Sequence, residues 1–148
     1  MNAQSLMTQQ PTVVFAGDSV SHAARLMRRL DVGMLPVVDD ATHRRLVGVL
    51  TDRDIVIRCL AEGHLTDCIV RDHMTSAPIA TVAPGATVRE IADRMEQSQV
   101  RRLPVVDAAG QVVGVVTQAD LARRVGPENP WLVEEVLERI STPGALVP

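Results

Sequence analysis

The stretch Met34-Leu35-Pro36-Val37-Val38-Asp39, continued by Leu46-Val47-Gly48-Val49-Leu50-Thr51-Asp52-Arg53-Asp54, decides the fold because the chain contains it twice. The second copy reads Arg102-Leu103-Pro104-Val105-Val106-Asp107, then Val112-Val113-Gly114-Val115-Val116-Thr117-Gln118-Ala119-Asp120. Each copy has two short aliphatic runs separated by a turn, and then Thr-x-x-Asp at the start of a helical pattern. The repetition predicts two copies of one small unit.

A strand and a helix are expected ahead of each copy. Residues 12–15 and 79–82 are predicted strands, and each follows a Met-Thr-x-x-Pro segment that ends at Pro11 or Pro78. The first helix begins at Asp18 or Ser19, and in the second copy Thr87 and Glu90 form a capping box. The closing helices, 52–62 and 118–125, end at Gly63 and at Gly126-Pro127, where a left-handed glycine is expected. Each unit is therefore β-α-β-β-α.

The remaining segments set the domain boundaries. Residues 1–10 begin polar and are expected to be loose at the chain end, and 64–73 are expected to form a short helix or turn. Asn129 is placed to cap an added helix whose apolar side includes Trp131. That helix either packs on its own domain or forms a dimer contact.

The predicted domains are 1–63, 64–126 and 127–148. The fold class is α+β, with two units packed sheet to sheet about a pseudo-twofold axis, because one helix layer cannot cover each sheet.

The composition narrows the class of protein. The chain has 148 residues and a net charge of −3, which argues against nucleic-acid binding. All 15 basic residues are arginines, so Schiff-base chemistry and a P-loop lysine are excluded. No apolar run is long enough to span a bilayer, and no signal peptide is visible. No catalytic signature occurs. We therefore expect a cytoplasmic protein that is not an enzyme and does not bind membranes.

The two Leu-Pro-Val-Val-Asp segments, each followed by Val-Gly-Val-x-Thr-x-x-Asp, resemble a tandem pair of cystathionine-β-synthase (CBS) domains, the arrangement called a Bateman module. The resemblance covers roughly residues 5–126. Thr-Asp-Arg-Asp-Ile and the added C-terminal helix also look like stand-alone bacterial members of the hypoxic-response-protein type. The resemblance implies binding of AMP, ADP, ATP or a related adenosyl ligand such as S-adenosylmethionine between the domains, and disc-like homodimers.

The Thr-x-x-Asp turns are the predicted ligand sites. A strand that becomes a helix at Thr51 or Thr117 presents free backbone N–H groups to a phosphate. Asp54 or Asp120, one turn further on, has the chemistry to hold a ribose. The alternative is a plain capping box that needs no ligand. Residues placed by the resemblance or by their charge complete the predicted set: Arg53, Thr75, Ile79, Arg101 and Arg102. Because Gly33-Met34 stands where the second copy has Arg101-Arg102, the second site is expected to be the better anion site.

Two cysteines and two histidines raise the question of a metal. Cys59, His64, Cys68 and His73 follow one another at offsets of five, four and five positions, and they contain no Cys-x-x-Cys. Buried thiols are therefore expected rather than a metal site, and a Cys59–Cys68 disulfide is not expected in a reducing cytoplasm.

The sequence thus predicts a non-enzymatic sensor that binds an adenine nucleotide, forms a homodimer and signals to a downstream protein partner. The alternative is a structural dimer or interaction protein with empty nucleotide clefts.

Overall fold

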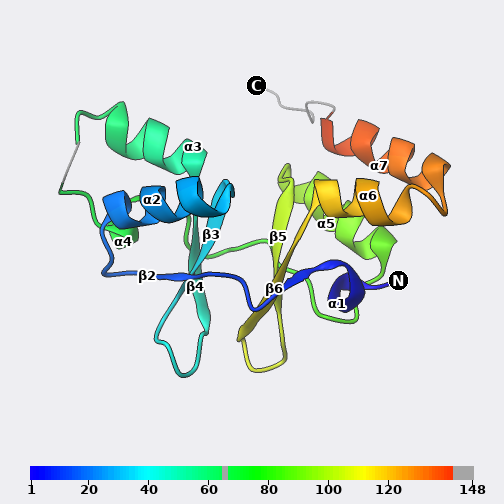
Figure 1. The fold of residues 1–148 in the computed structure, drawn as a ribbon, viewed down its shortest axis with the longest axis horizontal. Helices are drawn as coiled ribbons and strands as arrows, with labels where there is room; N and C mark the ends of the chain where they lie inside the picture. Colours follow the sequence, from blue (N-terminus) through cyan, green and yellow to red (C-terminus); the bar gives the residue numbers. More distant parts are fainter. Residues whose placement is uncertain (65–66, 142–148) are drawn as a thin grey trace. The chain divides into compact units, whose positions relative to one another are not determined.

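The structure, a computed structural model, describes residues 1–64 and 67–141 and divides into two compact units. Unit 2 comprises Thr12–Ile79 and Ala109–Val112 (Figure 1). Unit 1 comprises Met1–Pro11, Ala80–Ala108 and the chain from Val113 onward. Each unit thus combines segments that are distant in the sequence. The domains predicted from the repeats are instead continuous in sequence, with boundaries at 63/64 and 126/127. These boundaries stay a prediction.

Unit 2 is a three-stranded sheet with helices. Its strand order is β2 (Val14–Phe15), β3 (Met34–Val38) and β4 (Leu46–Thr51). β2 is parallel to β3, as a strand pair joined by α2 (Val20–Leu30) requires, and β3 is antiparallel to β4. After β4 come α3 (Asp52–Asp54), the π-helix η1 (Ile55–Leu60) and α4 (Val70–His73). The β-α-β-β-α order predicted from the sequence is confirmed here.

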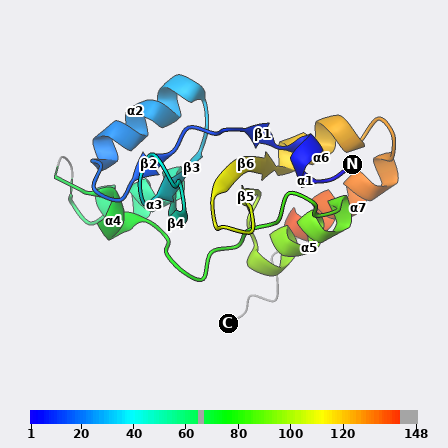
Figure 2. The same cartoon turned by 90° about the horizontal axis from the view of Figure 1, so that it is seen from below.

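Unit 1 has strand order β1 (Thr8–Gln9), β6 (Val112–Thr117) and β5 (Arg102–Val106). Its helices are α1 (Ala3–Leu6), α5 (Val88–Ser98), α6 (Gln118–Val125) and α7 (Pro130–Ser141). Figure 2 shows β1 running along β6 near the start of α6. The α+β class and the tandem pair of units are confirmed, whereas the predicted packing of the two sheets stays a prediction.

Each unit has its own aliphatic core. In unit 2 every residue of β3 is buried, and Leu35 and Leu50 are almost completely inaccessible. In unit 1 the corresponding positions are Leu103 and Val116, which pack with Ile91 of α5 and with α6. Burial of one such side chain contributes about 1.5–3 kcal/mol. The repeated Leu-Pro-Val-Val and Val-Gly-Val segments are therefore the core strands of both units.

The N-terminal segment forms a helix and a strand, which corrects the expectation that the chain end within residues 1–10 is loose. Asn2 caps α1, and Thr8 and Gln9 pair antiparallel with Val115 and Gly114. Thr75 pairs in the same antiparallel sense with Val49 in unit 2. The physical reason is that strands β4 and β6 carry backbone groups that need partners, and a Met-Thr segment supplies them in each unit.

Two glycines make room for these segments. A Cβ atom at Gly114 would overlap the Met7 side chain, and one at Gly48 would lie 2.5 Å from Met74 Sδ and 3.0 Å from the carbonyl oxygen of Thr75. Both strands thus need a residue without a side chain where the Met-Thr segment crosses. The glycine in each Val-Gly-Val segment therefore has a packing function.

Several element limits differ from those predicted. Around residues 79–82 the structure has a single parallel bridge, from Val82 to Val105, in place of a strand, and Pro84 two residues later ends further pairing. Ser19, rather than Asp18, caps α2 through the His22 N–H. Gly63 has φ +80° as predicted, but Gly126 stays right-handed at −52° because the chain makes a further helical turn up to Asn129.

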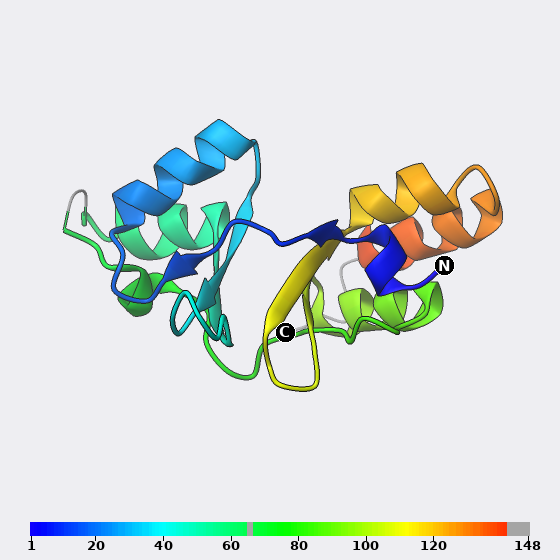
Figure 3. The same ribbon diagram turned by 60° about the horizontal axis from the view of Figure 1, so that its bottom comes forward.

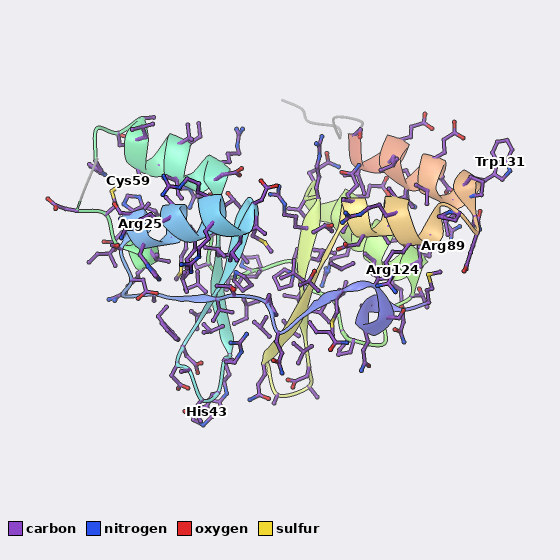
Figure 4. The ribbon with its side chains drawn as sticks, in the orientation of Figure 1. Arg25, His43, Cys59, Arg89, Arg124 and Trp131 are labelled. Atoms are coloured by element: carbon purple, nitrogen blue, oxygen red, sulfur yellow. A yellow bond between two sulfur atoms is a disulfide. The ribbon has the colours of Figure 1, made fainter. Side chains whose placement is uncertain are left out.

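Helix α7 packs within unit 1. The Asn129 side chain accepts the Leu132 N–H at 3.1 Å, as predicted, and Val133, Val136 and Ile140 are buried. Figure 3 shows α7 beside α5 and α6. Trp131 was expected on the apolar side, but it is 80% exposed and points away from unit 1 (Figure 4), since it lies in the first turn, before the packed residues begin.

Ion pairs fix the outer surface of α7. Arg139 Nη2 lies 2.7 Å from Asp93 Oδ1 and also contacts Glu96, and both acidic residues belong to α5. Hydrogen bonds to Asp93 and Glu96 raise the pKa of Arg139.

No helix within the described part of the chain is long and apolar enough to cross a membrane.

Candidate nucleotide site

The Thr117 turn of unit 1 is a complete capping box. Thr117 Oγ1 accepts the Asp120 N–H at 3.1 Å, and Asp120 Oδ2 accepts the Thr117 N–H at 2.8 Å. The Thr117 hydroxyl also donates to Asp120 Oδ2 at 2.9 Å. Thr-x-x-Asp therefore starts α6, as the sequence predicts, and the carboxylate lies one turn inside the helix.

Arg101 lies directly beside this turn. Its carbonyl oxygen accepts the backbone N–H of Gln118, the first residue of α6, at 2.9 Å. Arg101 and Arg102 are both exposed, and Arg102 is the first residue of β5. The backbone of Arg101 thus lies at the positive end of the α6 dipole, and two arginines in sequence beside it favour an anion there.

The Thr51 turn of unit 2 has the same backbone geometry. Asp54 Oδ2 accepts the Thr51 N–H at 2.9 Å, and the Asp54 N–H donates to Thr51 Oγ1 at 3.0 Å. The backbone N–H of Asp52 donates to the carbonyl oxygen of Gly33 at 2.9 Å. Gly33 therefore occupies the place that Arg101 occupies in unit 1. That the second copy is the better anion site stays a prediction.

The cations of unit 2 lie elsewhere. Arg53 is exposed within α3, and Arg58 of η1 lies 3.8 Å from Asp54 Oδ1. Arg58 also donates to the carbonyl oxygen of Met74 at 3.2 Å, an interaction that the sequence reasoning missed. The helical i to i+4 spacing of Asp54 and Arg58 is the signal that could have revealed the ion pair.

Thr75 and Ile79 both belong to unit 2. Thr75 and Val49 exchange two backbone hydrogen bonds of 2.9 Å, which places Thr75 against β4, two residues from Thr51. Ile79 is half-buried at the end of the unit. The predicted site residues are thus divided between the two units. Unit 2 contains Thr51, Arg53, Asp54, Thr75 and Ile79. Unit 1 contains Arg101, Arg102, Thr117 and Asp120.

The capping alternative for the two aspartates is confirmed, and a ligand role stays a prediction. In both turns one carboxylate oxygen is occupied by the threonine N–H. The second oxygen of Asp120 lies 3.4 Å from Arg123 Nη2, on the exposed side of α6. A carboxylate accepts about four hydrogen bonds, so the cap leaves acceptor capacity for a hydroxyl group.

Surface hollows on each unit lie away from these turns. One, on unit 1, is lined by Val82, Ala83, Gly85, Ala86, Glu90 and Arg94. Another, on unit 2, is lined by His22, Arg25, Leu26, Arg28 and Arg29. Neither contains a residue predicted for the nucleotide site.

The state of the two cysteines differs from the buried thiols that the sequence predicts. Cys59 and Cys68 are buried, as predicted, but they form a disulfide instead of two thiols. A turn at 61–63 follows η1, and the His64 N–H donates back to the carbonyl oxygen of Cys59. One ligand atom each from Cys59, Cys68 and His73 lies within 4.8 Å of the others.

Comparison with known proteins agrees with the repeat. The CBS domain family model matches residues 3–60 and 70–126. The chain belongs to the CBS domain family, as a tandem pair. Over 144 residues it is 37% identical to Hypoxic response protein 1 of Mycobacterium tuberculosis, and the alignment covers 97% of this chain and 96% of that protein.

Solved structures show the same fold. The crystal structure of Hypoxic Response Protein I, described with two coordinated zinc ions, matches with a TM-score of 0.75 and 37% identity over 84% of this chain and 98% of that one. The CBS domain pair of protein MJ0100, in complex with 5′-methylthioadenosine and S-adenosyl-L-methionine, has a TM-score of 0.77, 27% identity and coverage of 86% and 98%. CBSX2 in complex with AMP has a TM-score of 0.73, 28% identity and the same coverage.

Proposed function

We propose that this protein is a non-enzymatic regulatory module that binds an adenine nucleotide or a related adenosyl ligand and passes the bound state to a downstream protein. Membership of the CBS family supports the regulatory class, and AMP and S-adenosyl-L-methionine are present in structures of related domain pairs. The mechanism is a difference in affinity between two conformations, because a ligand shifts only an equilibrium whose states it binds unequally.

The main support for the proposal is the hydrogen bond from the Gln118 N–H to the carbonyl oxygen of Arg101. It holds the Arg101-Arg102 pair at the N-terminus of α6, next to the Thr117–Asp120 box. In this proposal the arginines and the α6 N-terminus bind phosphate, and the outer oxygen of Asp120 accepts a ribose hydroxyl. Thr51, Arg53, Asp54, Thr75 and Ile79 form the weaker site of unit 2, where Gly33 supplies no charge.

We place the protein in the cytoplasm as a homodimer. Three exposed apolar side chains of η1 support the dimer: Val56, Ile57 and Leu60 are 51%, 49% and 54% exposed. Trp131 adds a large exposed aromatic side chain on unit 1. Exposed apolar groups of this size are typical of surfaces that contact another protein.

The test is a thermal-unfolding series with AMP, ADP, ATP, S-adenosylmethionine and NADH. A ligand at about 100 times its Kd stabilises the folded state by about 2.7 kcal/mol, which shifts the midpoint of a chain of this size by several degrees. A shift with at least one adenosyl ligand is expected. If none of the five moves the midpoint, the nucleotide function is wrong.

A second candidate function is a structural dimer or interaction protein without a nucleotide. The observation that favours it is that both aspartates already act as helix caps. This function predicts dimerisation with no ligand-dependent shift, so the same series separates the two candidates.

A further inference from the structure

A second cluster with its own chemistry lies in unit 2, around the Cys59–Cys68 pair. Cys59 is in η1, Cys68 lies just before α4, and His73 is the last residue of α4. All three are at least 93% buried. Figure 4 shows the sulfur pair beside the end of the helix that carries Cys59.

His64 is an exposed neighbour of this cluster, outside the group of three residues whose ligand atoms lie within 4.8 Å of one another. Its ring centroid lies 5.8 Å from that of His73, in an edge-to-face arrangement. Its carbonyl oxygen lies 2.9 Å from Cys59 Sγ and 3.5 Å from Cys68 Sγ. A thiol donates a hydrogen bond to a carbonyl, whereas a disulfide sulfur has no hydrogen to donate. The surroundings of the two sulfur atoms therefore also suit a reduced pair.

The backbone holds these residues in place. The His64 N–H donates to the carbonyl oxygen of Cys59 at 2.9 Å, and the Val20 N–H donates to that of Cys68 at 2.9 Å. His73 is fixed by the short helix α4. Val20 and Ile55 pack against the two cysteines and provide an apolar surrounding. Ligand residues on a rigid backbone lose little conformational entropy when they bind an ion.

The donor set matches one class of ion. Two sulfur ligands and two imidazoles, at tetrahedral positions, form the closed type of zinc site. Soft thiolates and imidazoles disfavour Mg²⁺ and Ca²⁺, which prefer oxygen ligands. The spacing Cys59-x4-His64-x3-Cys68-x4-His73 has no tight knuckle, so the spacing does not reveal the proximity of Cys59, Cys68 and His73 that the structure shows.

We infer that the reduced form of this chain binds one Zn²⁺ through Cys59, Cys68 and His73, with His64 as the fourth ligand, and that the disulfide is the metal-free state of the same site. Reduction by a dithiol transfers two electrons and two protons to the cysteines and leaves the dithiol as a disulfide. Zinc then replaces the two thiol protons. Disulfides are rare in the cytoplasm, so the reduced pair is the state that the proposed location favours. The inference does not depend on the nucleotide function.

The primary test needs no substitution. The metal-free full chain is prepared oxidised, and also reduced with a phosphine, which takes the oxygen of one water as it becomes a phosphine oxide while the two protons go to the thiols. Dialysis against Zn²⁺ with elemental analysis is expected to give one zinc per reduced chain and none per oxidised chain. A reduced, folded chain that fails to retain stoichiometric zinc overturns the inference, and so does equal retention by both forms.

Substitutions then assign the ligands. Cys59→Ser, Cys68→Ser and His73→Asn are each expected to lose stoichiometric zinc and the thiolate-to-cobalt charge-transfer absorption of the Co²⁺-loaded chain. His64→Asn is expected to keep this absorption while its affinity falls and its visible cobalt bands change. His43→Asn is the matched control, because His43 belongs to the same unit and contacts Asp40 at 3.0 Å. Circular dichroism checks the folding of each variant. Unchanged cobalt spectra in His73→Asn and His64→Asn would show that the metal binds elsewhere.

Discussion

The carbonyl oxygen of Arg101 accepts the backbone N–H of Gln118, with 2.9 Å between nitrogen and oxygen. This bond links the last residue before β5 to the first residue of α6. The bond places an arginine, and not a neutral residue, next to the N-terminus of that helix. The equivalent bond of unit 2 joins Asp52 to Gly33, so the two units differ in charge at the same backbone position.

Replacing the arginine pair tests this difference. Arg101→Ala and Arg102→Ala are each expected to weaken AMP or ATP binding by about 10-fold or more, because a hydrogen bond to a charged group contributes about 1.5–3 kcal/mol. Isothermal titration calorimetry measures the affinity. Arg124→Ala, at an exposed position of α6 in the same unit, is the control and is expected to bind like the wild type. If Arg102→Ala leaves the affinity for nucleotide phosphates unchanged, the assignment of the anion site is wrong.

Removing the cap of α6 tests the structural function of Thr117. Thr117→Ala is expected to lower the free energy of unfolding by about 0.5–2 kcal/mol, since the Asp120 N–H loses its acceptor. Urea denaturation measures the change. Thr117→Ser keeps the hydroxyl group and is expected to stay within a few tenths of a kcal/mol of the wild type. Equal losses in both variants would show that the methyl group, and not the cap, stabilises the turn.

The contact between Gly114 and Met7 predicts a coupled pair. Gly114→Ala is expected to destabilise the fold by about 1–3 kcal/mol, because the added Cβ overlaps the Met7 side chain. In the double variant with Met7→Ala the loss should be smaller than the sum of the single losses. Thermal or urea unfolding of the four proteins gives the coupling energy. Strict additivity would mean that the N-terminal segment does not lie on β6.

The ion pairs of Arg139 predict a small, salt-sensitive contribution. Arg139→Gln is expected to lower the free energy of unfolding by about 1 kcal/mol or less at low salt, and by less at high salt, because the pairs are partly exposed. The pKa of Arg139 is raised in the folded protein, so this contribution is fully present below the ordinary arginine pKa while Asp93 and Glu96 are ionised, and it is lost as the pH rises through the raised pKa. Urea titrations at two ionic strengths measure the effect. A loss that is independent of salt would point to packing instead of charge.

The exposed side chains of η1 predict the dimer surface. Leu60→Asp is expected to give a monomer in analytical ultracentrifugation at micromolar concentration, where the wild type sediments as a dimer. Folding should be unaffected, because Leu60 is 54% exposed within its own chain. Arg124→Ala again serves as the control. A monomeric wild type would refute the dimer outright.

The sequence by itself determined the repeat, the order of elements and most of the helix caps. Thr87 with Glu90, Thr51 with Asp54, and Thr117 with Asp120 form the boxes that their spacing predicts. Such interactions join residues three apart, so local sequence is sufficient to specify them. The aliphatic runs around Leu35 and Leu103 likewise specify buried strands wherever the chain places them.

Only the tertiary structure decided which distant segments meet. Met7 and Thr8 precede the first repeat but lie on β6 of the second, and Trp131 is exposed although it stands in an apolar helix. Cys59 and His73, fourteen residues apart, bring their ligand atoms within 4.8 Å of each other. Each of these contacts depends on the path of the backbone between residues far apart in sequence, and spacing alone contains no information about that path.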